Sequence, residues 1–355
     1  MESKVLMKGN EAIGEGAIRA GCQAYFGYPI TPQTELLEYM SHRMIELGRV
    51  FVQAESEIAA INMCYGAAAA GARAMTSSSS PGISLKQEGI SYMAGAELPC
   101  VIVNVVRGGP GLGNIAPAQG DYFQATKGGG HGDYRLLVLA PASVQEAMDL
   151  TSLAFDLADK YRNPVMLLAD GLIGQVMEPV HLHDWTPQLV AKPWALTGAA
   201  GREKNVIKSI YLQPEKMEPH VQHLQRKYAQ MRSDEVRYAE MMVADADIVL
   251  VAYGTASRVC QTALKLARSE GLRVGLFRPI SLFPFPIQQI SDLAKSAKMF
   301  LVAELSSGQM VEDVRLAAAG KVPVHLVSRL GGMQLTPEEV LVAIKELGGN
   351  EGGAN

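Results

Sequence analysis

Two carboxylates, Glu55 and Glu57, follow an apolar run at residues 51–54 and precede a small-residue helical pattern. Ser56 is a favourable N-cap, so Glu57 is expected in the first helical turn, where exposed N–H groups and the helix dipole favour negative charge. A carboxylate at such a strand-to-helix junction is held rigidly, and its basicity can be tuned. A helix-start glutamate without a further role is the alternative, because acidic residues are enriched in first turns generally.

Two further junctions carry groups that suit a ligand. Thr31 follows a short apolar segment at 24–26, and Thr31 as N-cap with Pro32 at the first helical position predicts a helix start. Capping alone is the other interpretation of Thr31. Arg107 ends the apolar run 101–106 and precedes a glycine-rich loop, and a lone guanidinium in that place suits a carboxylate.

The elements that position these residues form a parallel α/β pattern between about residues 9 and 180. We expect strands near 24–26, 50–54, 73–76, 100–106, 136–139 and 165–169. Ligands of open α/β sheets bind beyond the carboxyl ends of the strands. Thr31, Glu57 and Arg107 are therefore expected to face one crevice.

A second α/β pattern begins at 248–252, with strands expected near 272–277, 299–303 and 323–327. Between the two patterns, residues 183–243 are proline-interrupted and then highly charged, which predicts a connecting arm. The arm wraps a partner subunit or is a solvated helix. The predicted boundaries are 1–182, 183–243 and 244–347, followed by a flexible tail at 348–355.

Composition excludes several classes of protein. The 355 residues carry a net charge of −4 and are 19% charged, which fits neither a nucleic-acid binder nor a disordered acidic chain. The start of the chain lacks the features of a signal peptide, and no apolar run approaches a membrane span. We expect a cytoplasmic protein of two α/β domains that binds neither nucleic acid nor membrane.

Four motifs carry a family resemblance: residues 28–32 (YPITP), 55–57 (ESE), 76–82 (TSSSSPG) and 107–110 (RGGP). They resemble the α subunit of thiamine-diphosphate-dependent 2-oxoacid:ferredoxin oxidoreductases, and the likeness extends to 251–255 (VAYGT). The four serines and the sequence GLGN at 111–114 are most similar to the branched-chain, 2-oxoisovalerate members. Members that act on 2-oxoglutarate rank second.

The resemblance implies a fold and an activity. Residues 1–182 would be a pyrimidine-type thiamine diphosphate-binding domain, and 244–347 a domain like the C-terminal domain of transketolases. The activity would be coenzyme A-dependent oxidative decarboxylation of 2-oxoisovalerate to acyl-CoA and CO₂, with electrons passed to ferredoxin. The alternatives are the same chemistry on 2-oxoglutarate, or a non-catalytic scaffold subunit.

The resemblance also implies roles for single residues. The family position of Glu57 hydrogen-bonds the aminopyrimidine ring of the cofactor, where a shared proton favours the reactive tautomer. Positions matching Thr31 and Arg107 contact the substrate and bind its carboxylate. Pro29, Ile30 and, more weakly, Ser79 are cofactor-contact candidates, although the serines at 77–80 also suit capping of a helix that starts at Pro81.

Missing motifs point to partner subunits. Thiamine enzymes usually hold the diphosphate through Mg²⁺ on a Gly-Asp-Gly motif, and this chain has none. The cysteines at 22, 64, 100 and 260 lack the spacing of an iron–sulfur cluster and are expected to be buried thiols. The expected partners are a β subunit with the diphosphate and Mg²⁺ site, γ and ferredoxin-like subunits that carry iron–sulfur clusters, and ferredoxin.

Two glycine-rich segments mimic nucleotide loops. Residues 111–116 match the dinucleotide pattern GxGxxA, but prolines at 110 and 117 bracket them, so no long helix is expected to follow. Residues 127–133 lack the ending of a Walker loop and are expected to form a surface loop or a mobile loop near a site entrance. In the second case His131 would touch substrate or coenzyme A.

Overall fold

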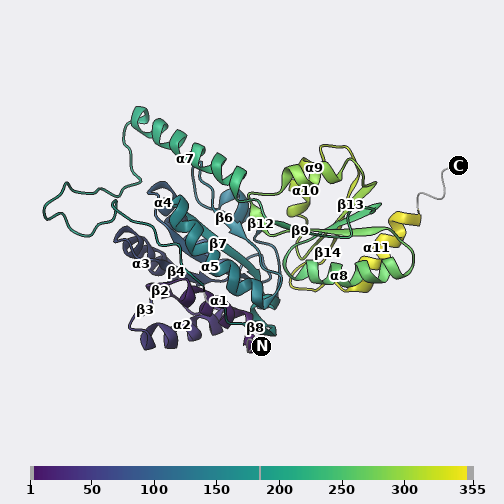
Figure 1. Cartoon of the computed structure of the whole chain (residues 1–355), viewed down its shortest axis with the longest axis horizontal. Helices are drawn as coiled ribbons and strands as arrows, with labels where there is room; N and C mark the ends of the chain where they lie inside the picture. The colour runs from purple at the N-terminus through teal and green to yellow at the C-terminus, as the bar shows by residue number, and fades with distance from the viewer. Residues whose placement is uncertain (1–3, 184, 350–355) are drawn as a thin grey trace.

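The computed structural model describes residues 4–183 and 185–349. Two α/β lobes lie side by side, and a long helix with its preceding loop projects from the first lobe (Figure 1). The expectation for a tail at 348–355 falls mostly outside the described residues, although the last helix includes Gly348 and Gly349.

The first lobe is built on a seven-stranded sheet in the order β12-β6-β7-β5-β4-β2-β3. Its parallel strands are β2 (Ala24–Gly27), β3 (Val50–Gln53), β4 (Ala74–Ser78), β5 (Cys100–Val106), β6 (Leu137–Leu139) and β7 (Pro164–Asp170). The helices between them are α1 (Gly9–Arg19), α2 (Thr34–Glu46), α3 (Glu57–Ala69), α4 (Ser80–Gly95) and α5 (Val144–Tyr161). Helix α1 packs on α2 and α5, and α3 packs on α4.

The second lobe has a five-stranded sheet in the order β14-β13-β10-β11-β9. Its parallel strands are β10 (Ile248–Val251), β11 (Val274–Pro279), β13 (Met299–Glu304) and β14 (Val324–Ser328). Its helices are α8 (Gly254–Ser269), α9 (Ile287–Leu293), α10 (Met310–Ala318) and α11 (Pro337–Gly349). The expectation of two α/β parts with parallel sheets is confirmed.

Four short strands were not expected from the sequence. Strand β1 (Lys4–Lys8) pairs antiparallel with β8 (Met177–His181). Strand β9 (Tyr238–Met241), inside the predicted arm, pairs antiparallel with β11 of the second sheet. Strand β12 (Ser281–Phe283), from the C-terminal part of the chain, pairs antiparallel with β6 of the first sheet. Each sheet therefore gains an antiparallel edge strand, and β12 ties the two lobes together.

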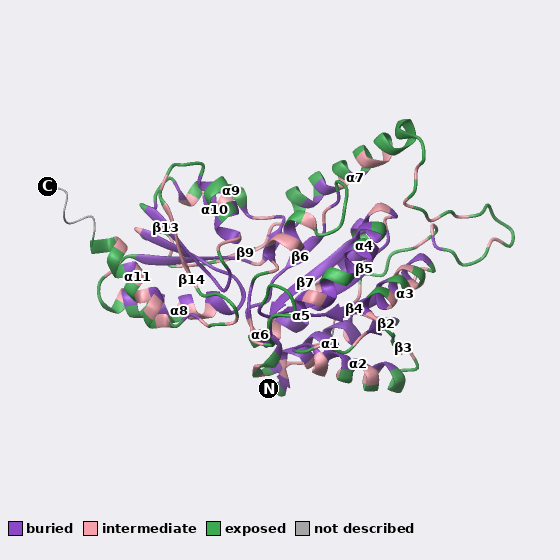
Figure 2. Cartoon of the chain, turned by 180° about the vertical axis from the view of Figure 1, so that it is seen from behind, coloured by how far each residue is buried: buried purple, intermediate pink, exposed green. Residues whose placement is uncertain are grey.

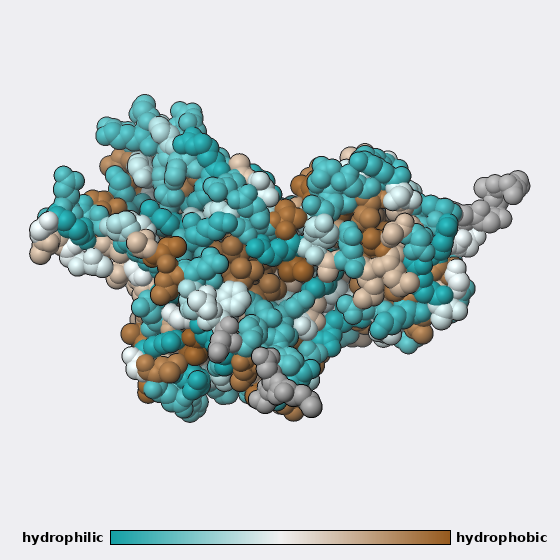
Figure 3. Space-filling view, viewed as in Figure 1, coloured by the Kyte–Doolittle hydropathy of each residue, from teal (hydrophilic) through white to brown (hydrophobic). Residues whose placement is uncertain are grey.

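The rest of the predicted arm is a long loop followed by helix α7 (Pro214–Asp234). The side of α7 visible in Figure 3 is largely hydrophilic. Three residues of its other face, Leu224, Tyr228 and Met231, are buried. Helix α7 is therefore amphipathic, with a hydrophilic side and a buried apolar side. None of the helices in the described parts of the chain is long and apolar enough to span a membrane.

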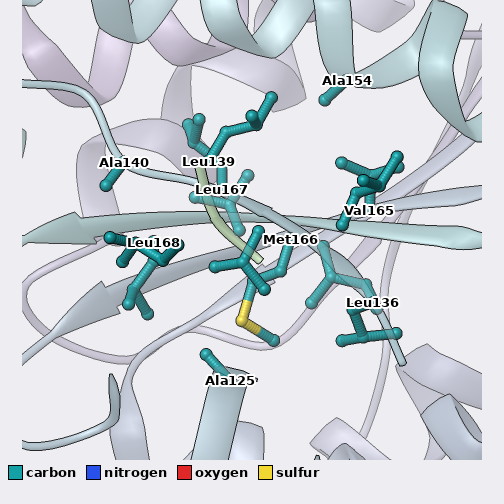
Figure 4. Close-up of a cluster of buried hydrophobic side chains, with 14 of the residues drawn as sticks. Ala125, Leu136, Leu139, Ala140, Ala154, Val165, Met166, Leu167 and Leu168 are labelled. Carbon is teal, nitrogen blue, oxygen red and sulfur yellow. The ribbon is translucent and has the colours of Figure 1, made fainter. Parts of the chain in front are cut away.

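The core lies around the central strands of the first sheet, which are buried along their whole length (Figure 2). On β7, Val165 and Leu167 point to the side of Ala154 of α5, while Met166 and Leu168 point to the opposite side (Figure 4). Side chains of a strand alternate between its two faces, so a strand covered on both sides reads as a continuous apolar run. This rigid layer fixes the loops at its carboxyl edge.

Candidate functional site

Glu57 is the first residue of helix α3 and lies directly after strand β3. The Ser56 hydroxyl accepts a hydrogen bond from the Ala59 amide at 3.1 Å, so the predicted N-cap is present. Glu57 is only 7% exposed. Among the hydrogen bonds of the described residues, none involves its carboxylate, and neighbouring Glu55 is exposed. A buried acceptor at a helix start is thus left open for a ligand.

Helix α4 brings a glycine against this carboxylate. A Cβ atom on Gly82 would lie 2.6 Å from Glu57 Oε1 and 2.1 Å from the Ser78 hydroxyl, so a larger residue here would displace these side chains. The hydroxyls of Ser78 and Ser79 are buried without a hydrogen-bond partner. Helix α4 begins at Ser80, with Ser79 in the N-cap position but making no side-chain cap. The expectation that serine hydroxyls cap a helix starting at Pro81 is therefore wrong for Ser79, whose hydroxyl points elsewhere.

Thr31 does not cap helix α2. The helix begins at Thr34 with Gln33 in the N-cap position, and the Thr31–Pro32 peptide bond is cis. The carbonyl oxygens that helical amides would use are taken by side chains. The Thr31 carbonyl accepts from Arg107 Nη1 at 3.0 Å, and the Pro32 carbonyl accepts from Asn10 Nδ2 at 2.7 Å. Thr31 and Pro29 are exposed, and Ile30 is half-buried.

Arg107 lies at the end of β5 and contacts the residues that follow two other strands, Thr31 after β2 and Ser80 after β4. Besides Thr31, its guanidinium donates to the Leu112 carbonyl from Nη2 at 3.0 Å, and its backbone N–H donates to the Ser80 hydroxyl at 3.1 Å. Arg107 Nε is buried without a partner. The structure thus brings Thr31 and Arg107 into contact and leaves a charged donor for a ligand.

The four residues discussed above follow neighbouring strands at one edge of the first sheet. Strands β5, β4, β2 and β3 are adjacent in the sheet, and their carboxyl ends carry Arg107, Ser79, Thr31 and Glu57 respectively. Because parallel strands end at the same edge of the sheet, these residues lie along one edge of the first sheet.

A cavity of about 820 Å³ lies beside Arg107, between the two lobes. Its lining includes Leu112 from the loop after β5, Asp121, and Leu305 of the second lobe. Asp121 accepts from Asn104 Nδ2 at 2.9 Å, and burial raises the pKa of its carboxyl group. Glu57 is not part of this lining. Sequence reasoning missed Asp121 and Asn104, although Asn104 inside a buried apolar run was a signal for a polar network.

The two nucleotide-like segments form no nucleotide loop. Residues 111–116 form a loop closed by a bridge between Arg107 and Pro117, and no long helix starts directly after it to receive a pyrophosphate. The segment 127–133 begins in a π-helix, η1 (Gln124–Gly128), and continues as a largely exposed loop. His131 lies edge-on to Tyr92, with ring centroids 6.2 Å apart.

The four cysteines are buried free thiols, as expected. Among the described residues, no group of three or more His, Cys, Asp or Glu side chains is placed to hold a metal ion.

Comparison with family models gives two matches along the chain. Residues 15–245 match the thiamine diphosphate-binding domain of pyruvate flavodoxin/ferredoxin oxidoreductases, and residues 246–340 match core domain II of pyruvate:ferredoxin oxidoreductase.

Characterised relatives are similar over almost the whole chain. The chain is 55% identical to ketoisovalerate oxidoreductase subunit VorB of Methanothermobacter thermautotrophicus, covering 97% of this chain and 98% of the relative. It is 37% identical to 2-oxoglutarate synthase subunit KorA of Methanothermobacter marburgensis, covering 96% and 98%.

Solved structures share the fold. A 2-oxoglutarate:ferredoxin oxidoreductase from Magnetococcus marinus, with 2-oxoglutarate, coenzyme A and succinyl-CoA bound, superposes with a TM-score of 0.88 at 28% identity. The match covers 97% of this chain and 65% of that one. A split-gene transketolase superposes with a TM-score of 0.60 at 13% identity, which supports the fold alone.

Proposed function

The chain belongs to the pyruvate flavodoxin/ferredoxin oxidoreductase family, and we propose that it is the α subunit of a 2-oxoisovalerate:ferredoxin oxidoreductase. The observation that carries the proposal is the one edge of the first sheet along which Glu57, Thr31 and Arg107 lie, with Arg107 Nε buried without a partner, Thr31 exposed and no hydrogen bond to the Glu57 carboxylate among the described residues. The reaction is oxidative decarboxylation of the 2-oxoacid to acyl-CoA and CO₂, with electrons passed to ferredoxin.

Similarity favours the branched-chain substrate. The chain is 55% identical to a ketoisovalerate oxidoreductase subunit and 37% identical to a 2-oxoglutarate synthase subunit, each over nearly its full length. The lining of the cavity beside Arg107 includes Pro110, Leu112, Leu305 and Leu330 among polar residues such as Ser306 and Gln309, so it offers apolar surface to an aliphatic side chain. 2-Oxoglutarate is the alternative substrate.

The residues at this edge fit thiamine diphosphate. A buried carboxylate, two buried serine hydroxyls without hydrogen-bond partners and a glycine that keeps space beside the carboxylate form a cradle that polar ring atoms can complete. When bound, thiamine diphosphate supplies the carbon nucleophile for the 2-oxo group and takes up the electrons left when CO₂ departs.

The chain's own residues bind and orient the cofactor and the substrate. Glu57 shares a proton with a pyrimidine ring nitrogen, and its place in the first turn of α3 keeps that carboxylate fixed. Pro29, Ile30 and the Ser79 hydroxyl would contact the cofactor. Arg107 binds the substrate carboxylate through Nε, and Thr31, held by Arg107 at its carbonyl, hydrogen-bonds the substrate.

Partner subunits complete the complex in this proposal. A β subunit holds the diphosphate through Mg²⁺, and γ and ferredoxin-like subunits carry the iron–sulfur clusters. Coenzyme A is the cosubstrate, and the complex works in the cytoplasm. We retain 1–182 as the thiamine-binding domain, 183–243 as the arm and 244–347 as the transketolase C-terminal-like domain. The change of family model after residue 245 supports the later boundary.

The experiment is an assay of the native complex, purified through a tag on this chain and kept free of oxygen. Coenzyme A-dependent viologen reduction is compared for 2-oxoisovalerate, 2-oxoglutarate and pyruvate. We expect 2-oxoisovalerate to be used best. Preference for 2-oxoglutarate would make that acid the substrate and leave the reaction unchanged. No reduction by a complex that contains thiamine and iron would overturn the proposed reaction.

A further inference from the structure

The loop that follows Arg107 is closed by its own backbone. The Gly108 amide donates to the Ala116 carbonyl at 2.9 Å, and the Asn114 amide donates back to the Gly108 carbonyl at 2.9 Å. Gly113 has a φ of +60°, and a Cβ atom there would lie 1.7 Å from the Gly108 carbonyl oxygen, so a larger residue would force the loop apart. The loop therefore has a defined shape.

This loop carries one of the acceptors that hold the Arg107 guanidinium. Nη2 of Arg107 donates to the Leu112 carbonyl at 3.0 Å, and Nη1 donates to the Thr31 carbonyl at 3.0 Å. Among the described residues Nε is buried without a partner, and in the proposed function it binds the substrate carboxylate. Because a guanidinium is planar, fixing Nη1 and Nη2 also fixes the direction of the Nε–H bond. A shift of the Leu112 carbonyl would therefore turn that donor away from the substrate.

The Asn114 side chain ties the loop to the second lobe. Its Oδ1 accepts from the Ala116 amide at 2.9 Å, and its Nδ2 donates to the Gly331 carbonyl at 2.8 Å. A second contact comes from Gln334, whose Nε2 donates to the Pro117 carbonyl at 2.9 Å. Gly331 and Gln334 follow strand β14 of the second sheet. The second lobe thus holds the loop at two points.

The two segments approach each other closely. Gly332 has a φ of +95°, and a Cβ atom there would lie 2.6 Å from the Ala116 Cβ and 3.0 Å from Asn114 Oδ1. Gly331 also lines the cavity of about 820 Å³ beside Arg107. The contact between the lobes therefore lies at the wall of the cavity that the proposed substrate enters.

We propose that Asn114 is a positioning residue for Arg107, and that the second lobe acts through it on the binding of the substrate carboxylate. The inference rests on the proposed function, because Arg107 is the proposed ligand of that carboxylate. Asparagine suits this place because one planar group supplies both an acceptor and a donor. Both bonds are exposed, so water can replace them when the side chain is removed and the chain keeps its fold.

The test is steady-state kinetics of the native complex with 2-oxoisovalerate and coenzyme A. Asn114→Ala removes both bonds of the side chain. Gln334→Ala removes the second contact and leaves the Asn114 amide in place. The matched control is Asn205→Ala, because the Asn205 amide donates to the carbonyls of Pro193 and Ala195, at 2.6 and 2.9 Å, in the loop before α7.

We expect Asn114→Ala to raise KM for 2-oxoisovalerate by about 3- to 10-fold, the range for the loss of one or two ordinary hydrogen bonds. The values of kcat and of KM for coenzyme A should stay within about twofold, because only substrate binding is weakened. Gln334→Ala should act in the same direction, and Asn205→Ala should have no effect. In an Arg107→Lys background, which lacks Nη2, adding Asn114→Ala should change KM no further.

An unchanged KM for 2-oxoisovalerate in Asn114→Ala would overturn the inference. An equal rise in KM for coenzyme A, or an equal effect of Asn205→Ala, would also overturn it, because either result indicates a general disturbance of the complex. So would an effect of Asn114→Ala that is undiminished in the Arg107→Lys background. If the unmodified complex oxidises no 2-oxoacid, the proposed function itself fails, and that separate result is seen before any variant is compared.

Discussion

At the scale of single residues, a feature could be predicted from the sequence where it depends on one side chain and the backbone next to it. The Ser56 cap before Glu57 is such a case, because an N-cap bond spans only three residues. The helix start predicted at Thr31 is wrong, because side chains distant in the sequence bind the carbonyls that a helix would need. Arg107 binds the Thr31 carbonyl, and Asn10 binds the Pro32 carbonyl. Lys86 and Asp121 had no sequence signal, because only the fold shows that they are buried.

Replacing Arg107 by lysine is expected to raise KM for 2-oxoisovalerate by about 10- to 100-fold, because a charge-assisted hydrogen bond is worth about 1.5–3 kcal/mol. Lysine keeps the charge but loses Nε and the planar fork. Steady-state kinetics of the complex give the value. Arg135→Lys is the control, because Arg135 donates to two backbone carbonyls outside the cavity beside Arg107. An unchanged KM in Arg107→Lys would remove Arg107 from substrate binding.

Lys86 of helix α4 is fully buried, and its titration makes the stability of the folded chain depend on pH. Its pKa is about 8 in the folded chain, against 10.5 as the ordinary value. Below pH 8 both states carry the proton, and the folded state bears the full cost of the buried charge. Between about pH 8 and 10.5 the unfolded chain binds a proton that the folded chain does not, so stability rises with pH.

Relative to Lys86→Met, the free energy of unfolding of the unmodified chain should therefore increase by about 3 kcal/mol across that window, at about 1.4 kcal/mol per pKa unit. Urea unfolding of both proteins from pH 7 to 10.5 measures the difference. A difference that is constant with pH would show that Lys86 keeps its ordinary pKa.

At the scale of elements, apolar periodicity placed every predicted strand of both sheets within a few residues. It missed β1, β8, β9 and β12, which are short antiparallel strands with partially polar sequences such as YAEM at 238–241. Such strands form because a partner strand distant in the sequence offers hydrogen-bonding groups, which periodicity does not register.

The contact between helices α3 and α4 depends on Gly82. Substitution by alanine would drive a methyl group against Glu57 Oε1 and the Ser78 hydroxyl, so the carboxylate must move. We expect turnover of the complex to fall by about 100-fold, the effect of a displacement of about 1 Å at a reacting group.

The control for this substitution is Gly66→Ala. Gly66 is exposed inside helix α3, and an added Cβ would meet nothing within 4 Å. That variant should keep its turnover and gain about 0.5–1 kcal/mol of stability, because alanine is the better helix residue. Equal turnover in Gly82→Ala and Gly66→Ala would contradict the proposed role of the Glu57 position.

At the scale of the whole molecule, the two lobes are joined by buried polar contacts as well as by β12. Asp170 at the end of β7 accepts from the backbone N–H of Thr255 at 2.8 Å and from its hydroxyl at 2.5 Å. Tyr122 donates to Asp313 of α10 at 2.6 Å. These contacts hold the two lobes together. The sequence predicted two α/β parts but not this contact, because no local pattern specifies which side chains meet across an interface.

The central claim is that this chain contributes catalytic groups to a 2-oxoacid oxidoreductase and is not a scaffold. The most direct measurement is the rate of coenzyme A-dependent viologen reduction by 2-oxoisovalerate in complexes that carry Glu57→Gln or, as the matched control, Glu55→Gln. We expect Glu57→Gln to keep its fold and assembly and to lose about 10²- to 10⁴-fold in turnover, the contribution typical of a positioned proton-transfer group. Glu55→Gln, changed at an exposed carboxylate two residues away, should keep its rate. A near-normal rate for Glu57→Gln in a complex loaded with thiamine diphosphate would contradict the account and favour the scaffold.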